Sequence, residues 1–206
     1  MKIIGLTGGI ASGKNIVAEI FARNGAIIFD ADKEVHQLLE SDESVIAAVS
    51  ENFPQAVFGK KIDRQILGKA VFANKEKLQI LEKILHPRVR KNYKNFVKEN
   101  RQKKEKLLVL NIPLLLETGH YSCDYVVAII SKRALRKERF LQREKKKNPA
   151  NFAARTAELE KRFNAITRAQ LSDAKRKENA DFAIYNNGSK LELVGCVDRL
   201  LKKLPA

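Results

Sequence analysis

A glycine-rich segment near the start of the chain carries the clearest chemical signal. Residues 8–15 read Gly-Gly-Ile-Ala-Ser-Gly-Lys-Asn, the pattern G-x-x-x-x-G-K without its usual final Ser or Thr. Such glycines let backbone N–H groups close around an anion, and the helix that follows adds the positive end of its dipole. A purely structural turn is the alternative, but a strand before the segment and a helix after it favour phosphate binding. We therefore expect a nucleotide site made by Gly9, Ile10, Ala11, Ser12, Gly13, Lys14, Asn15 and Ile16.

Within this segment the last two positions have separate roles. Lys14 supplies a mobile cation for the β- and γ-phosphates of ATP, and the next residue is usually a hydroxyl that ligates Mg²⁺. Asn15 stands there instead. An amide oxygen is also a hard ligand that can coordinate Mg²⁺, so Asn15 is the metal ligand we expect. Its side chain is larger and differently aimed than a hydroxyl, which makes nucleotide binding a firmer expectation than turnover.

Acidic candidates follow the second predicted strand. Asp32 lies just past that strand, where a carboxylate can accept or orient the proton of an attacking hydroxyl. The alternative is that Asp30 or Asp32 only caps the next helix, since Asp is a favoured N-cap residue. The two interpretations are compatible if one residue caps and the other is the base. We assign the catalytic role to Asp32.

Arg136, Arg139 and Arg143 are spaced by three and four residues, so one helix face carries all three. Phosphoryl transfer is accelerated by cations placed on the transferring oxygens, and arginines on a closing segment supply them while water is excluded. The alternative is a solvated basic face, which is the interpretation we favour for residues 145–147.

These residues require a scaffold of buried strands and helices. Short apolar runs predict strands at 2–6, 26–29, 107–110, 125–130 and 181–185. A helical pattern follows the glycine segment and ends at Asn24-Gly25. Strands alternating with helices predict an α/β fold with a doubly wound, five-stranded parallel sheet, in which ligands bind at the carboxyl ends of the strands.

Two long stretches are helical in pattern. Residues 33–100 predict an inserted helical subdomain, with a break at Pro54 and Gly59 and an interruption at Pro87. Residues 132–180 are basic, helical and poor in apolar residues. Residues 189–204 predict a closing amphipathic helix capped by Ser189. We therefore divide a single domain into a core (1–32, 101–131 and 181–206), the helical subdomain 33–100 and a basic helical segment, 132–180.

Composition narrows the class of protein. Apolar residues make up 44% of the 206 residues and charged residues 31%, which is ordinary for a globular chain. No apolar run approaches the roughly 20 residues of a membrane span, and no signal segment precedes the first strand, so we expect a cytoplasmic protein. The net charge of +16 favours anionic partners. Because no nucleic-acid motif or aromatic platform accompanies it, we expect phosphorylated small molecules rather than nucleic acid.

Taken together, the motifs resemble those of the dephospho-CoA kinase family over nearly the whole chain. They are Leu6 to Lys14, Asp30-Ala31-Asp32, His86-Pro87, Ile112-Pro113-Leu114-Leu115 with Glu117, and Ala180-Asp181 followed by Asn186-Asn187-Gly188. Each motif alone is weak, whereas five in the right order are specific.

The resemblance implies a P-loop NTPase core, a CoA-side subdomain matching 33–100 and a mobile lid matching 132–180. It implies transfer of the γ-phosphoryl of ATP, with Mg²⁺, to the ribose 3′-hydroxyl of dephospho-CoA. It also implies an adenine-side role for Asn187, substrate contacts by His86 with Arg88 as a possible phosphate partner, and catalytic roles for the lid residues Arg139 and Arg143.

The chain departs from the family pattern at several positions. Asn111 replaces a frequent Asp, Arg136 stands where glutamine is more usual, and Ile166 stands where the family has an arginine. With Asn15, the Asn111 departure leaves open a weaker metal site or low activity. Two alternatives therefore stay beside the family's reaction: a P-loop kinase of another nucleoside or nucleotide, and a catalytically weak nucleotide-binding relative.

Overall fold

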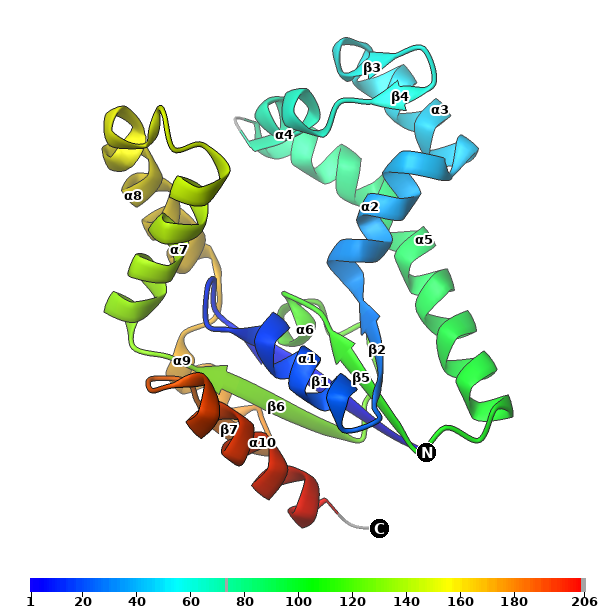
Figure 1. Ribbon diagram of the computed structural model, residues 1–206. Coiled ribbons are helices and arrows are strands. Elements are labelled where there is room, and N and C mark those ends of the chain that lie inside the picture. The colour runs from blue at the N-terminus through cyan, green and yellow to red at the C-terminus, as the bar shows by residue number, and fades with distance from the viewer. Residues whose placement is uncertain (73, 205–206) are drawn as a thin grey trace. The chain divides into compact units, whose positions relative to one another are not determined.

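The computed structural model describes residues 1–72, without the Phe72 side chain, and 74–204. The chain forms two compact units, one from residues 1–29 with 105–206 and the other from the continuous segment 30–104. Figure 1 shows the elements of both units along the chain. The helical stretch expected at 33–100 lies inside the second unit, and the basic stretch 132–180 belongs to the first.

The first unit is built on a five-stranded parallel sheet in the order β2-β5-β1-β6-β7. β1 is central and pairs in parallel with β5 and β6, and β6 pairs in parallel with β7. All five predicted strands are confirmed, because each apolar run is short and buried. Their bounds are β1 Lys2–Gly8, β2 Ile27–Asp30, β5 Leu107–Asn111, β6 Tyr125–Ile130 and β7 Phe182–Tyr185.

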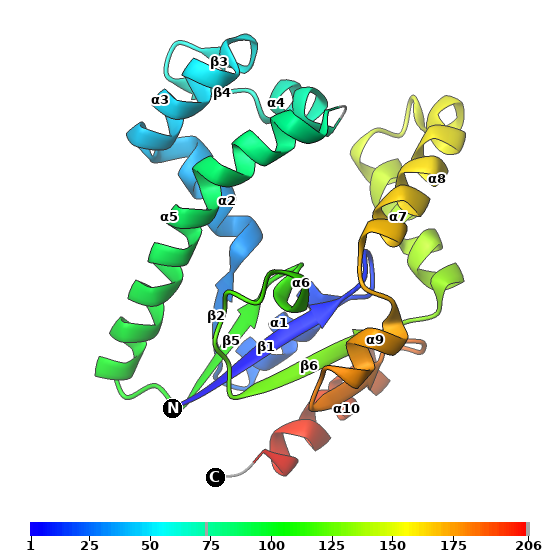
Figure 2. The same cartoon turned by 180° about the vertical axis from the view of Figure 1, so that it is seen from behind.

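Two helices cover one face of this sheet, α1 (Lys14–Arg23) and α10 (Lys190–Lys203), as Figures 1 and 2 show from opposite sides. Their buried side chains share one hydrophobic core with the strands. Ser189 caps α10 as predicted, because its hydroxyl accepts the N–H of Glu192 at 3.2 Å. The short helices α6 (Leu115–Thr118) and α9 (Asp173–Glu178) pack on the sheet from the other side.

The basic stretch folds as two longer helices, α7 (Arg133–Lys147) and α8 (Phe152–Ala169), followed by α9. The few apolar residues of α7 and α8 are concentrated in a small core of Phe140, Leu159 and Phe163, all at most 2% exposed. The predicted helical character is confirmed. The low apolar content is sufficient to pack α7 against α8, because these side chains gather in one cluster.

The second unit consists mainly of helices, α2 (Ala31–Ser41), α3 (Glu43–Asn52), α4 (Arg64–Phe72) and α5 (Lys75–Gln102). The predicted break is a 3₁₀ turn, η1 (Pro54–Ala56), followed by a hairpin of β3 (Val57–Phe58) and β4 (Lys61–Ile62). Gly59 turns this hairpin with φ 63°, a left-handed conformation that favours glycine. The hairpin itself was not predicted.

The predicted interruption at Pro87 is wrong. α5 runs without a break for 28 residues and contains Pro87 in its interior. A proline there removes one backbone hydrogen bond and crowds the carbonyl four residues before it. Tertiary packing outweighs this cost, because buried side chains anchor the helix on both sides of the proline: Leu81, Leu85, Val89 and Tyr93. Among the residues that the structure describes, no helix has both the length and the apolar composition that a bilayer crossing requires.

Candidate active site

The predicted phosphate loop lies between the carboxyl end of β1 and the start of α1. Its backbone is folded tightly: the N–H of Ser12 donates to the carbonyl of Gly9 at 3.1 Å, and α1 begins with the N–H of Val17 donating to Gly13 at 3.1 Å. Gly13 has φ 101°, which only glycine adopts readily. Ala11 has φ 56°, where an L-residue costs about 1–2 kcal/mol. The loop therefore has the wrapped geometry expected of an anion cradle.

Neighbouring groups leave no room for side chains at the glycines of this loop. Asn186, just after β7, donates from Nδ2 to the carbonyl of Ser12 at 2.8 Å. A Cβ at Gly13 would collide with that same Nδ2, and a Cβ at Gly8 would collide with Ser12 Oγ and a backbone carbonyl of β6. The loop glycines are thus required by close packing as well as by backbone conformation.

The outer side of the loop is held by the basic stretch. Ile10 donates its N–H to Oε1 of Gln170, the residue directly after α8, at 2.9 Å. Ile10 and Ala11 also pack against the small core of α7 and α8. The sequence assigned Gln170 no role, since nothing in it indicates a hydrogen bond across 160 residues.

At the other end of the loop, the two asparagines that depart from the family pattern meet. Nδ2 of Asn111, at the end of β5, donates to Oδ1 of Asn15 at 3.1 Å, and Asn111 is 3% exposed. A carbonyl oxygen has two lone pairs, so Oδ1 of Asn15 can accept this bond and still face a cation. Magnesium in phosphoryl-transfer sites uses few protein oxygens beside phosphate. The donor set therefore fits Mg²⁺, although the described residues hold no group of three or more His, Cys, Asp or Glu side chains that would bind a metal alone.

The segment after β7 also contacts the start of α7. Oδ1 of Asn187 accepts the N–H of Lys132 at 2.8 Å. Arg139 donates from Nη1 to Ser131 Oγ at 3.1 Å and to the carbonyl of Asn186 at 3.2 Å. The structure thus brings Asn187 and Arg139, two predicted site residues, to one side of the phosphate loop.

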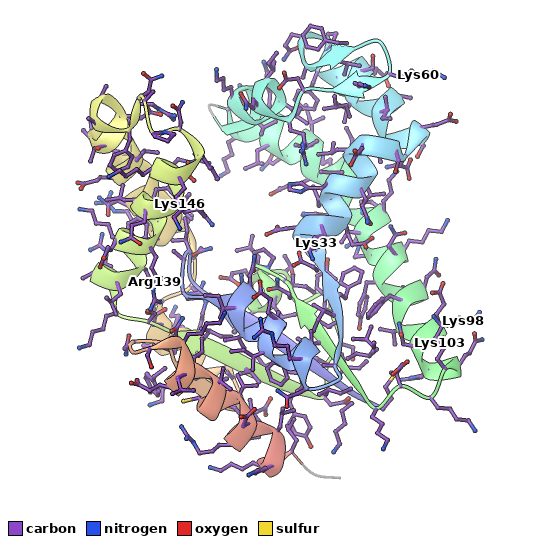
Figure 3. The ribbon with its side chains drawn as sticks, in the orientation of Figure 1. Lys33, Lys60, Lys98, Lys103, Arg139 and Lys146 are labelled. Carbon is purple, nitrogen blue, oxygen red and sulfur yellow. The ribbon has the colours of Figure 1, made fainter. Side chains whose placement is uncertain are left out.

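The three arginines of α7 have different environments. Arg143 is 56% exposed, lies over the Phe140 ring at 5.6 Å and is 3.7 Å from the Glu144 carboxylate. Figure 3 labels Arg139 on the same helix. Arg136, which the sequence analysis did not assign to the site, is only 6% exposed. It lies against the phosphate loop, so close that a Cβ added at Gly9 would collide with its Nη1.

Arg136 belongs to a cluster of four charged side chains, made of two buried arginines and two partly exposed carboxylates. Its Nη2 is 3.4 Å from Oδ2 of Asp173, while Oδ1 of Asp173 is 3.6 Å from Nη1 of Arg176. Arg176 is 1% exposed and pairs with Oε1 of Glu117 at 2.9 Å. Burial lowers the pKa of Arg136, and nearby Arg176 lowers it further, while Asp173 opposes both effects. Only the motif that contains Glu117 could have indicated this cluster from the sequence.

In the second unit, Asp30 caps α2, with Oδ1 accepting the N–H groups of Asp32 and Lys33 at 3.1 Å each. This confirms that one carboxylate of the pair is a cap. Asp32 lies in the first turn of α2, and its catalytic role stays a prediction.

His86 and Arg88 lie on different sides of α5. His86 lines a cavity of about 490 Å³ together with Gln79, Glu82, Lys83, Pro87 and Arg90. Arg88 instead donates from Nε and Nη2 to Ser44 Oγ at 3.2 and 3.1 Å, and from Nη1 to the carbonyl of Ile84 at 2.7 Å. Arg90, which sequence reasoning did not consider, is the arginine that shares the cavity with His86.

A central parallel strand that ends in a G-x-x-x-x-G-K loop, followed directly by a helix, defines the P-loop NTPase class of α/β proteins. Comparison with known proteins specifies the family. The family model described as dephospho-CoA kinase matches residues 2–192. The dephospho-CoA kinase of Bartonella henselae is 42% identical over 193 residues, which cover 93% of this chain and 92% of that protein.

Solved structures agree with this assignment. A protein from Thermus thermophilus superposes with a TM-score of 0.76 at 28% identity, covering 100% of this chain and 98% of its own. Dephospho-CoA kinase from Campylobacter jejuni gives a TM-score of 0.62 at 26% identity, covering 98% and 96%. The chain belongs to the dephospho-CoA kinase family, whose members are ATP-dependent kinases.

Proposed function

We propose that this protein transfers the γ-phosphoryl group of ATP to the ribose 3′-hydroxyl of dephospho-CoA, the last step of coenzyme A biosynthesis. The observation that carries the proposal is the family match over residues 2–192. The proposal includes action in the cytoplasm, where a soluble biosynthetic substrate is available.

In this proposal the phosphate loop binds the triphosphate of ATP. Its wrapped backbone and the N-terminus of α1 direct N–H groups and a positive dipole end toward an anion. Lys14, the first residue of α1, neutralises the β- and γ-phosphates. Asn187, in the segment after β7, acts at the adenosine side, and Arg139, which donates to the carbonyl of Asn186 in that segment, keeps its catalytic role as a lid arginine.

Asp32 acts as the general base. Its carboxylate accepts the proton of the 3′-hydroxyl as the hydroxyl oxygen attacks the γ-phosphorus. The cap of α2 supports this role. Because the Asp30 carboxylate accepts the N–H groups of the first turn, the helix does not need Asp32 as its cap.

Asn15 is the protein ligand proposed for Mg²⁺, with Asn111 orienting its amide. When bound with ATP, Mg²⁺ would neutralise charge on the β- and γ-phosphates. The pair of amides carries no formal charge, so this chain would hold the metal mainly through the nucleotide.

The acceptor is assigned to the second unit. The cavity beside His86 contains two cations, Lys83 and Arg90, that suit the anionic phosphates of dephospho-CoA. Arg88 contributes by holding α5 to Ser44 of α3, in addition to its predicted role as a phosphate partner. Arg143, exposed on α7, is the arginine we assign to the transferring phosphate when the basic stretch closes as a lid.

The proposal is tested by incubating the protein with Mg²⁺ and ATP, with and without dephospho-CoA, while ADP formation and acceptor mass are followed. Acceptor-dependent ADP release and one added phosphoryl group on dephospho-CoA are expected. Phosphorylation of a nucleoside or nucleotide in preference to dephospho-CoA would support a different P-loop kinase. ATP binding without turnover on any acceptor would support the weak nucleotide-binding relative that Asn15 suggests.

A further inference from the structure

Arg136 is buried although it lies on a strongly basic helix, α7. Its exposed fraction is 6%, whereas that of the Arg143 side chain on the same helix is 56%. A buried guanidinium is costly unless its donors are paired. The family resemblance places glutamine here, so the arginine is a feature of this chain rather than a requirement of the fold.

The donors of Arg136 are incompletely used. A guanidinium has five N–H donors. Nη2 faces Asp173 at 3.4 Å, Nη1 lies against Gly9, and Nε is buried without a hydrogen-bond partner in the described part of the chain. The fork of this side chain therefore points toward the phosphate loop with capacity for another acceptor.

The surrounding carboxylates do not fill that capacity. Asp173 divides its two oxygens between Arg136 and Arg176, at 3.4 and 3.6 Å. Glu117 is engaged by Arg176, the other buried arginine, whose Nε is likewise without a partner in the residues described. Two guanidiniums thus share two carboxylates beside the loop, and an additional anion would find donors already in place.

The position of Arg136 along the loop indicates which part of a nucleotide it would meet. Asn186, on the adenosine side of the proposed site, contacts the loop at Ser12 and Gly13. Arg136 contacts the loop at Gly9, the opposite end. A nucleotide whose base lies near Asn186 therefore directs the phosphates farthest from its adenosine toward Arg136.

We propose that Arg136 is a further phosphate ligand of the site, which binds the terminal phosphates of ATP while Asp173 anchors it beside Gly9. Phosphate oxygens match the planar guanidinium fork and form charge-assisted hydrogen bonds with it. This inference rests on the proposed role of the loop in binding ATP. It adds a specificity determinant, because Arg136 favours nucleotides with β- and γ-phosphates over AMP.

The test is the binding of ATP, ADP and AMP, measured by calorimetry without acceptor, for the wild type, Arg136→Gln and Lys146→Gln. Glutamine is the more usual residue of the family at position 136, and Lys146 is a charge-matched control at the exposed end of α7 (Figure 3). For Arg136→Gln we expect the Kd of ATP to rise about tenfold, the loss of one charge-assisted contact, and the Kd of AMP to change less than about twofold. Lys146→Gln should bind all three nucleotides as the wild type does.

An unchanged Kd for ATP in Arg136→Gln would overturn the inference, and so would an equal loss for ATP and AMP, which indicates a structural role alone. If Arg136→Gln does not fold, Arg136→Lys is judged by the same criteria, since it keeps the charge and removes the fork. Lys14→Ala distinguishes a failure of the phosphate-loop assignment from a failure of the role proposed for Arg136. If it leaves ATP binding intact, the loop assignment itself fails; if it weakens ATP binding while Arg136→Gln does not, only the role of Arg136 fails.

Discussion

Glu117→Ala should be one of the most destabilising single substitutions in the first unit. Oε1 of Glu117 accepts Nη2 of Arg176 at 2.9 Å and the N–H of Leu171 at 3.2 Å. Arg176 is 1% exposed, so the substitution leaves a buried guanidinium with Asp173 at 3.6 Å as its nearest remaining carboxylate partner. Breaking a buried ion pair costs roughly 3–5 kcal/mol. Because Asp173 compensates in part, we expect about 3 kcal/mol.

For a chain of this size that cost corresponds to a decrease in Tm of roughly 6–12 °C. The assay is thermal unfolding followed by circular dichroism and calorimetry. Glu160→Ala is the matched control, because Glu160 pairs with Lys137 at a similar distance, 2.9 Å, but both side chains are about 40% exposed. An exposed pair contributes about 0–1 kcal/mol, so the control should lose little.

Equal Tm values for Glu117→Ala and Glu160→Ala would refute the argument, since burial would then not decide the strength of the pair. A second check is the double variant Glu117→Ala with Arg176→Met. It removes both members of the pair and should lose less stability than Glu117→Ala alone.

Three other predictions concern the loop, the metal and a helix cap. Gly13→Ala should weaken ATP binding about tenfold in calorimetry through backbone strain and collision, whereas Gly25→Ala, at φ 84° with open space around it, should leave binding unchanged. The double variant Asn15→Ser with Asn111→Asp should lower the half-saturating Mg²⁺ concentration for ADP formation about tenfold, because it adds a carboxylate near the metal; no change would mean that ATP alone holds the metal. Asp42 caps α3. Hydrogen bonds from the Ser44 hydroxyl and the Val45 backbone N–H lower the pKa of the Asp42 carboxyl below its usual 3.8. Its stabilisation is therefore present above that value and lost as the pH falls through the folded-state pKa, so the roughly 1 kcal/mol deficit of Asp42→Ala at pH 7 in urea unfolding should shrink as the pH falls below 3.8.

Local patterns predicted most of the fold. The strands were found because each is a short apolar run followed by a turn or a loop, and the phosphate loop because its glycines and lysine are consecutive. The interruption predicted at Pro87 was wrong because long-range packing overrides a local pattern there. A proline is a strong local signal, and the buried side chains on both sides that keep α5 continuous are visible only once the helix is packed.

The candidate site was less predictable where it depends on long-range contacts. Asn15 and Asn111 were each recognised as departures from the family pattern, but their hydrogen bond joins positions 96 residues apart. Arg136 was considered as one of three arginines on a helix face and as a departure from the family pattern, but not as a site residue. Its burial depends on Asp173 and Gly9, which the fold brings to it from α9 and the loop after β1.

The order of elements along the chain has a consequence for biosynthesis. The central strand β1 is translated before its neighbours β5 and β6, which come after residue 106, and α10, which closes the same core with Val197 and Leu200, follows later still. The segment 30–104 is continuous and has its own contacts. During translation this segment can therefore assemble while β1 and the phosphate loop still lack their partner strands, so the nucleotide-binding unit completes its core later than the helical unit.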